Sequence, residues 1–214
     1  MTTSYVSSAA AESTTVAMPS HQAGDLILAI AWRGTSNTIP TLPAGWTKIV
    51  TNSTGSSASI CAYKVAASGS ETTGTWTNAT MVAVGVWQDN TNYLLPGNTI
   101  VTRTTSTSIT YGAVQARNSA SSWFAGLVAA SLNSTTTESP PTNMTNRVSL
   151  AGASVSEIAI HDTNAVSGDW PATNVTVSAE IAHAYVIELF DTGISKTSSS
   201  GIKSQGSMSG GMAA

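Results

Sequence analysis

Short apolar or alternating segments recur along the whole chain, separated by clusters of Gly, Pro, Asn and Ser. Short segments of this composition, bounded by turn-forming residues, are typical of β-strands. We predict strands at 24–32, 45–51, 58–66, 81–88, 121–131, 156–162, 174–180 and 183–190. Because no long, capped helical periodicity interrupts them, the pattern predicts an all-β fold of the β-sandwich or jelly-roll type.

The segment GDLILAIAW at 24–32 is apolar on both faces of the predicted strand. Side chains alternate between the two faces of a strand, so Leu26, Leu28, Ile30 and Trp32 share one face, and Ile27, Ala29 and Ala31 share the other. A strand of this kind has to be covered on both sides. We expect the cover to come either from a two-sheet core or from a neighbouring subunit.

One stretch of the chain, TLPAGWTKIV at 41–50, has a counterpart in SPPTNMTNRV at 139–148. At a constant offset of 98, Pro43, Trp46 and Thr47 correspond to Pro141, Met144 and Thr145. The same offset aligns Ile60 with Ile158, Tyr63 with His161, Ala83 with Ile181, and Trp87 with Tyr185. The pattern predicts two pseudo-repeated halves, about 5–98 and 99–192.

The repeated motif is predicted to be a structural turn. Pro43 restricts the backbone, and Gly45 supplies the conformational freedom that a tight turn needs. The large side chain that follows, Trp46 in the first copy and Met144 in the second, is expected to fill equivalent buried positions in the core.

For domain organisation we predict a single β unit over 1–192 and a Gly/Ser-rich arm over 193–214. Two tandem domains remain the alternative, and the stretch at 93–98 is expected to be an ordered crossover. The arm from residue 196 has Ile202, Met208 and Met212 as its sizeable apolar groups. Ordering such a chain requires extensive contact, so these residues are predicted to anchor the arm on a neighbouring subunit by strand addition.

Charge and cysteine content exclude several classes of protein. Charged residues are 9% of the chain, and its eight Lys and Arg form no basic patch, which argues against nucleic acid as a partner. Cys61 is the single cysteine and is expected to be a small strand residue. No apolar run is long enough for a membrane span, and the N-terminus lacks the features of a secretion signal. We expect synthesis in the cytoplasm and no membrane insertion.

Candidate chemical groups are few, and most have a simpler structural explanation. Asp162, Asn164 and Asp169 could offer oxygens to Ca²⁺, but their spacing does not match an EF-hand, and a turn between strands is favoured. His21, His161 and His183 lack the spacing of a metal site. No nucleophile elbow or phosphate-binding loop occurs. We therefore predict no catalytic, cofactor-binding or metal-binding residues, no cofactor and no enzymatic activity, with a glycosidase carboxylate pair as the least favoured alternative.

Six tryptophans raise the question of a carbohydrate site. Trp32, Trp46, Trp87 and Trp123 lie in predicted strands and are expected in the core. Trp76, in GTWTN, and Trp170, in GDWPA, lie among loop residues. If any aromatic side chain is exposed for stacking against a ligand, we expect it to be one of these two.

Three segments together, GDLILAIAW, PAGWTKI and CAYKVAASGSETTGTWTNATMVAVGVW, resemble a recurrent β-rich module of tailed-bacteriophage virion proteins. Members of that family read roughly Gly-Asp-Leu-Leu-Leu-Ala, Pro-Pro-Ala-Gly-Trp-Thr, Tyr-Lys-x-Ala and Thr-Trp-Thr. The resemblance covers about 13–190 and is weaker in the second half, where Asn143 and Met144 replace Gly and Trp.

The resemblance implies a non-enzymatic structural protein on the outer surface of a virion, as a minor tail, fibre-associated or head-decoration component. Its partners would be other virion proteins and copies of itself. The alternative is a carbohydrate-binding adhesin that recognises a host surface glycan.

Overall fold

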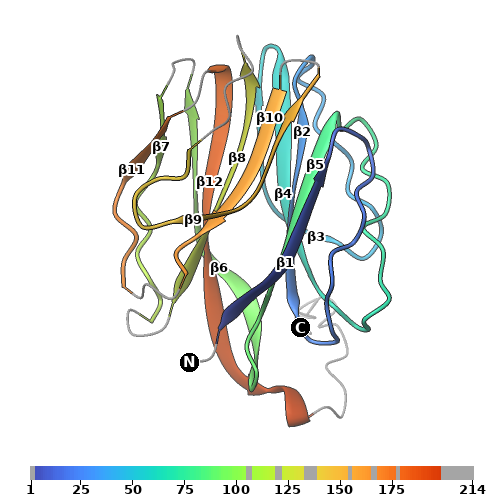
Figure 1. The fold of residues 1–214 in the computed structure, drawn as a ribbon, viewed down its shortest axis with the longest axis vertical. Helices are drawn as coiled ribbons and strands as arrows, with labels where there is room; N and C mark the ends of the chain where they lie inside the picture. The colour runs from blue at the N-terminus through green and yellow to red at the C-terminus, as the bar shows by residue number, and fades with distance from the viewer. Residues whose placement is uncertain are drawn as a thin grey trace, which may run out of the picture.

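The computed structural model describes residues 3–104, 108–118, 122–132, 139–153, 156–164, 168–176 and 179–198. These residues form twelve β-strands and one short 3₁₀ helix (Figure 1). Every strand pairing is antiparallel. The prediction of an all-β chain is therefore confirmed for the part of the chain that is described.

Two five-stranded sheets make up most of the structure. The first has the order β1–β5–β2–β4–β3, formed by β1 (Ser4–Ala11), β5 (Met81–Gln88), β2 (Leu26–Arg33), β4 (Ser57–Val65) and β3 (Thr47–Thr54). The second has the order β6–β12–β8–β10–β9, formed by β6 (Asn92–Thr104), β12 (Ala179–Ser195), β8 (Trp123–Leu132), β10 (Ser156–Asp162) and β9 (Thr145–Gly152). A two-stranded sheet joins β7 (Ser108–Tyr111) to β11 (Thr173–Thr176), and the helix η1 (Lys196–Ser198) follows β12.

All eight predicted strand segments contain observed strands, although several bounds differ. The prediction for 156–162 matches β10, whereas the segment 183–190 is the middle of the longer β12. The stretch at 93–98 was expected to be a crossover but is the first part of β6, paired with the end of β12. Local composition misled here, since Pro96 and Gly97 signal a turn while the pairing with β12 holds the chain extended.

The hydrophobic core lies between the two large sheets, which pack against each other (Figure 1). One cluster of buried side chains draws on both, including Leu28 and Trp32 from the first sheet and Leu127, Ile160 and Tyr185 from the second. Burying an aliphatic or aromatic side chain of this size contributes about 1.5–3 kcal/mol. This shared cluster is what holds the sheets together.

Both sheets are also buried on their outer faces, as the apolar residues on both faces of the segment 24–32 predicted for β2. Its second face, with Ile27, belongs to a separate cluster that includes Val16, Trp46 and Trp76 from the loops. The outer face of the second sheet is covered by β7, which pairs with β11, and by the segments that carry Val114, Met144 and Trp170. For β2, the cover thus comes from the chain's own loops and needs no neighbouring subunit.

The two Pro-led turns have the same backbone geometry. The Trp46 amide donates to the Pro43 carbonyl (3.4 Å), and the Met144 amide donates to the Pro141 carbonyl (3.0 Å). The residue before each large side chain has a positive φ, +83° at Gly45 and +71° at Asn143. Asn is the non-glycine residue that best tolerates this region, so its presence in the second copy preserves the turn.

Trp46 and Met144 are both buried, each 8% exposed, and each packs on the outer face of its own sheet. The prediction that both are buried is confirmed. Each turn also leads into a strand with an irregularity at the same place. The extra residue lies between Lys48 and Val50 in β3, and between Asn146 and Val148 in β9.

The constant offset of 98 does not hold into the following strand. Ile60 lies on the outer face of its sheet, whereas Ile158, its counterpart at that offset, lies in the core between the sheets. Thr47 pairs with Tyr63, and Thr145 pairs with Asp162 rather than with His161. The cause is the β9–β10 connection, where Gly152 pairs with Ser156 across three residues, while Thr54 pairs with Ser57 across two. One extra residue moves every following side chain to the other face.

Replacing Trp46 by Ala is expected to cost about 3–5 kcal/mol of unfolding free energy, because it leaves a cavity in the outer cluster. The indole also donates from Nε1 to the Thr73 carbonyl (3.0 Å) and packs edge-on against Trp76. Trp46→Phe, which keeps most of the ring, should lose clearly less. Urea unfolding of the three proteins measures this, and a loss below about 1 kcal/mol for Trp46→Ala would contradict the assigned core role.

Candidate functional site

The two loop tryptophans do not form a ligand platform. Trp76 is 0% exposed and Trp170 is 4% exposed, so neither is the solvent-exposed aromatic that the sequence allowed for at these two positions. Trp76 packs against Trp46, with ring centroids 5.1 Å apart, and Trp170 pairs through its backbone with Val114. The polar composition of these loops suggested exposure, but the loops pack against the outer faces of the sheets and bury both tryptophans.

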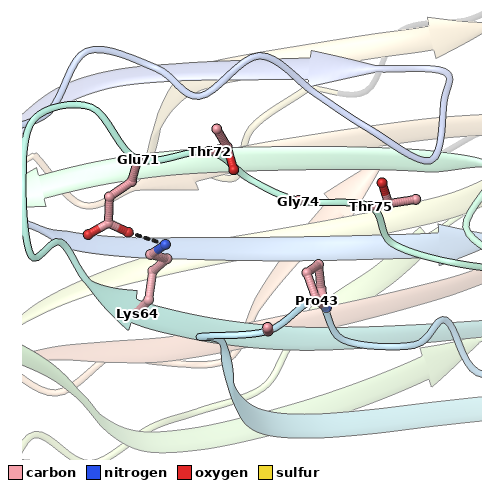
Figure 2. Close-up of a pocket in the computed structure, with 7 residues that line it drawn as sticks. Pro43, Lys64, Glu71, Thr72, Gly74 and Thr75 are labelled. Atoms are coloured by element: carbon pink, nitrogen blue, oxygen red, sulfur yellow. Dashed lines mark ion pairs between the residues drawn. The ribbon is translucent and has the colours of Figure 1, made fainter.

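A hollow of about 560 Å³ lies beside the first Pro-led turn (Figure 2). It is lined by Pro43, Ala44, Lys64, Glu71, Thr72, Gly74 and Thr75. Gly74 has a φ of +72°, and a Cβ there would lie 2.6 Å from the Pro43 Cβ. The loop therefore approaches the turn as closely as glycine permits, which fixes the shape of the hollow.

The charged groups of this hollow neutralise each other. Lys64 and Glu71 form an ion pair, and Lys64 also lies over the Trp46 ring, 5.6 Å from its centroid. Burial raises the pKa of Glu71, but the hydrogen bond from Lys64 and the backbone N–H groups of Ala67 and Ser68 outweigh it and lower the pKa below its ordinary value. The hollow thus offers hydroxyl groups and a satisfied ion pair, with no activated nucleophile.

The polar stretch HDTNAVSGDW contains Asp162, which forms a buried ion pair with Arg147. Asp162 is 0% exposed, and its carboxylate receives two hydrogen bonds from Arg147, Nε to Oδ2 at 2.9 Å and Nη2 to Oδ1 at 2.8 Å. The Trp87 indole N–H donates to Oδ2 (2.9 Å) and the Asn164 amide to Oδ1 (3.0 Å). Every lone pair that a cation would need is directed at a protein donor.

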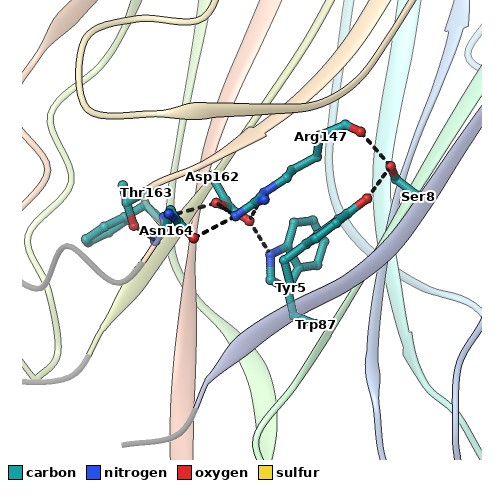
Figure 3. Close-up of polar contacts among 8 residues, drawn as sticks. Tyr5, Ser8, Trp87, Arg147, Asp162, Thr163 and Asn164 are labelled. Atoms are coloured by element: carbon teal, nitrogen blue, oxygen red, sulfur yellow. Dashed lines mark hydrogen bonds and ion pairs between the residues drawn. The ribbon is translucent and has the colours of Figure 1, made fainter.

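The same network joins the two large sheets (Figure 3). Arg147 on β9 lies over the ring of Tyr5 on β1, with its guanidinium carbon 4.3 Å from the centroid. The Arg147 carbonyl accepts from the Ser8 hydroxyl (2.8 Å), which is itself bonded to the Tyr5 hydroxyl (2.7 Å). Trp87 on β5 completes the link to Asp162 on β10. Asp162 thus fixes how the sheets sit against each other.

Asp169 lies apart from Asp162 and accepts a hydrogen bond from the Ala116 amide (2.9 Å). Among the described residues, no group of three His, Cys, Asp or Glu side chains could hold a metal ion. The favoured prediction of a turn is consistent with the structure, in which Asn164 has a φ of +44° just after β10.

The three histidines lie in three separate parts of the structure. His21 bonds the Pro19 carbonyl (2.7 Å) in a loop. His161 bonds the Tyr111 hydroxyl (3.1 Å) on the outer face of the second sheet. His183 lies in the core between the sheets, 2.6 Å from the Ser59 hydroxyl, which also bonds the Tyr185 hydroxyl. Sequence reasoning did not find the Ser59–His183 pair, since 124 residues separate its members.

The Ser59–His183 pair has the hydrogen bond of a nucleophile and its base, but it lacks access. Both residues are 0% exposed, with the Trp32 ring packed edge-on against His183 at 5.0 Å. Burial, with a smaller contribution from Arg103, lowers the pKa of His183 from 6.5 to about 4. The nearby Cys61 is also buried, which raises its thiol pKa well above the ordinary value. The hydrogen bond thus pairs the Ser59 hydroxyl with Nδ1 of His183 inside the core.

Glu188 is a second buried carboxylate that the sequence did not reveal. It accepts from the Asn98 amide (2.9 Å), the Arg117 amide (2.6 Å) and the Ser122 hydroxyl (2.6 Å). This carboxylate ties β6 and the segment before β8 to β12. Like Asp162, it is occupied by donors of its own chain and offers no acid or base to a glycoside.

An apolar groove of about 360 Å³ opens where β4, β6 and β12 end or begin. Its lining residues are Val65, Ala66, Ala67, Tyr93, Leu95, Thr192 and Ile194. Ile194 is 49% exposed, the highest value among the exposed large hydrophobic residues that are described. Among the described surface features, this groove is the candidate functional site.

Lys196, just after the last strand, is held in place beside the apolar groove by two contacts. β12 continues to Ser195, so the first residues of the predicted arm belong to the strand. The Lys196 amide donates to the Thr91 carbonyl (2.8 Å), and its ammonium group lies 3.4 Å from the Asp25 carboxylate. The predicted anchors Ile202, Met208 and Met212 lie outside the described residues.

Replacing Arg147 by Met should destabilise the protein by about 3–5 kcal/mol, because Asp162 then stays buried without its cation. The control is Arg103→Met, since Arg103 is exposed and its effect should stay within about 0.5 kcal/mol. Chemical denaturation measures both. A cost for Arg147→Met no larger than that of the control would show that the network does not hold the sheets together.

The pH dependence of the unfolding free energy should reveal the lowered pKa values of the two buried histidines. Burial lowers the pKa of His161, as of His183, from 6.5 to about 4. The unfolded chain therefore binds protons that the native chain does not, and stability should fall as the pH drops from about 6.5 towards 4, by up to ~1.4 kcal/mol per pH unit for each histidine. In His161→Gln with His183→Gln, this slope should be largely lost. An unchanged slope in urea titrations would contradict the assignment.

Within the described residues, no helix is long and apolar enough to cross a bilayer. Burial or internal pairing accounts for the chemically reactive side chains discussed above, and the apolar groove offers an apolar surface to a partner. Comparisons of this chain with protein-family models, with curated proteins and with solved structures found no match.

Proposed function

We propose that this chain is a non-enzymatic structural subunit of a tailed-bacteriophage virion, located on the particle's outer surface. It would act as a minor tail, fibre-associated or head-decoration component that docks onto copies of itself and onto other virion proteins. The residue patterns GDLILAIAW and PAGWTKI suggest this class, and they correspond to β2 and to the Pro-led turn before β3.

We also infer that the two sheets form a β-sandwich of two pseudo-repeated halves. Three observations support duplication. The strand orders β1–β5–β2–β4–β3 and β6–β12–β8–β10–β9 correspond position by position. Both Pro-led turns have a positive φ before a buried side chain, and both following strands have an irregularity at the same place.

A structural role agrees with where the polar chemistry lies. Asp162 and Glu188 are each 0% exposed and accept hydrogen bonds from donors of the same chain. Groups that are buried and satisfied stabilise a fold and do not meet a substrate. The carbohydrate-binding alternative loses its specific support, because Trp76 and Trp170 are both buried.

The observation that carries the proposal is the apolar groove at the root of the C-terminal arm. An exposed apolar surface on a folded subunit typically marks an interaction site. The arm itself is a Gly/Ser-rich segment with Ile202, Met208 and Met212 as isolated apolar groups. A segment of this composition gains order by contact with another surface. Groove and arm together suit a subunit that is fastened into a larger assembly.

Deleting residues 199–214 is expected to leave a folded protein that no longer joins the particle. The deletion keeps Lys196 and its ion pair with Asp25, so the melting temperature should change little. A full-length variant with Ile202, Met208 and Met212 changed to Ser should behave in the same way, whereas Leu at positions 208 and 212 should be tolerated.

Electron microscopy and quantitative mass spectrometry of purified particles from a complemented infection measure incorporation. Wild-type protein is expected at regular positions on the particle surface. Absence of the wild-type subunit from mature particles would refute the virion proposal, and normal occupancy of the deletion variant would refute the role of the arm.

A further inference from the structure

The apolar groove is built from three segments that are far apart in sequence. β4 and the loop after it supply Val65, Ala66 and Ala67, while the start of β6 supplies Tyr93 and Leu95. The end of β12 supplies the remaining wall with Thr192 and Ile194. Seven residues from three segments enclose a volume of about 360 Å³, which suits an aliphatic side chain together with its flanking backbone.

The lining calls for an apolar occupant. Aliphatic and aromatic groups dominate it, and the Thr192 hydroxyl is already engaged with the Tyr93 carbonyl (2.9 Å). The charged groups beside the lining are paired within the chain, Lys196 with Asp25, and Lys64 with Glu71, which also accepts from the Ala67 amide. Ile194 remains 49% exposed beside this lining, so covering it would remove apolar surface from water.

The chain itself supplies a segment of matching chemistry. After Ser198 come Ser199, Ser200 and Gly201, and then Ile202, which is the first large apolar residue beyond the described part of the chain. Only three residues, 199–201, connect Ser198 to Ile202, so the connection is short. Short connections of this kind favour exchange of the segment with a second copy.

We propose that the apolar groove of each subunit is the receptor for the C-terminal arm of a second copy, with Ile202 of that copy inserted against Ile194 and Leu95. This inference rests on the proposed function and specifies the partner and the surface that it uses. The sixteen residues 199–214 span up to ~50 Å when extended, which is enough to reach across a neighbouring domain. Met208 and Met212 then lie further along the same neighbour.

An inter-chain disulfide tests the contact directly in full-length protein. One preparation carries Ala67→Cys at the rim of the groove, and the other carries Lys203→Cys beside Ile202. Cys61 is 0% exposed, so the introduced thiols are the accessible ones. After mixing and mild oxidation, a heterodimer of the two variants on non-reducing gels is expected, since neither chain can form this link alone.

Two matched variants test the role of the groove. Ile194→Lys places a charge in its wall and should reduce the yield of heterodimer about tenfold or more. Ile39→Lys changes an isoleucine of similar exposure, 39% against 49%, and should leave the yield unchanged. As a positional control, Asn37→Cys replaces Ala67→Cys. Residue 37 follows the end of β2, whereas Val65 beside the groove pairs with Leu26 at its beginning, so no heterodimer is expected.

Three results would overturn the inference. They are the absence of a heterodimer, equal yields with Ile194→Lys and Ile39→Lys, and an exclusively intramolecular disulfide when Ala67→Cys and Lys203→Cys are in one chain. Failure here is distinguishable from failure of the proposed function. If the cross-link fails while deletion of 199–214 still blocks incorporation into particles, the arm binds another surface and the virion role stands. If the cross-link forms but the wild-type protein is absent from particles, self-association stands and the virion role falls.

Discussion

Burial on two faces is the constraint on which the rest of this structure depends. The central strands β2 and β8 carry apolar side chains on both sides, so neither sheet could be stable with one face in water. The two sheets cover each other's inner faces, and the long connections together with β7 and β11 cover the outer ones (Figure 1). This requirement explains why loops of polar composition contain buried tryptophans.

The buried carboxylates Asp162 and Glu188 are tolerated inside this double-sided core because each accepts several hydrogen bonds at short range. The Arg147–Asp162 pair with Trp87 spans the two sheets, and Glu188 accepts from donors on β6 and on the segment before β8. Buried ion pairs stabilise a fold little in comparison with apolar packing. They do fix the relative position of the segments they join, because any other arrangement leaves a buried charge without its partner. The network thus contributes to a single orientation of the two sheets. The same burial separates His183 and Ser59 from solvent.

The apolar groove lies where β12 approaches its C-terminal end, beside the start of β6. There Ile194 is 49% exposed beside Tyr93 and Leu95. This fold buries its reactive groups and leaves an apolar groove beside the Gly/Ser-rich arm. Such an arrangement is suited to assembly with other subunits. The proposed exchange of arms would join subunits without a covalent bond, and it would use a surface that each copy already carries.

The sequence by itself determined the strand content, the two-sided burial of β2 and the burial of Trp46 and Met144. These features depend on alternation and on local turn chemistry, which a short window of residues contains. Only the tertiary structure decided that Trp76 and Trp170 are buried, that residues 93–98 are strand, and that one extra residue before β10 reverses its faces. It alone brought Ser59 to His183 and Asp162 to Trp87, and it alone placed an open groove beside the start of the arm. Contacts between residues far apart in sequence decide these features, because a local pattern specifies which side chains need cover but not which distant segment provides it.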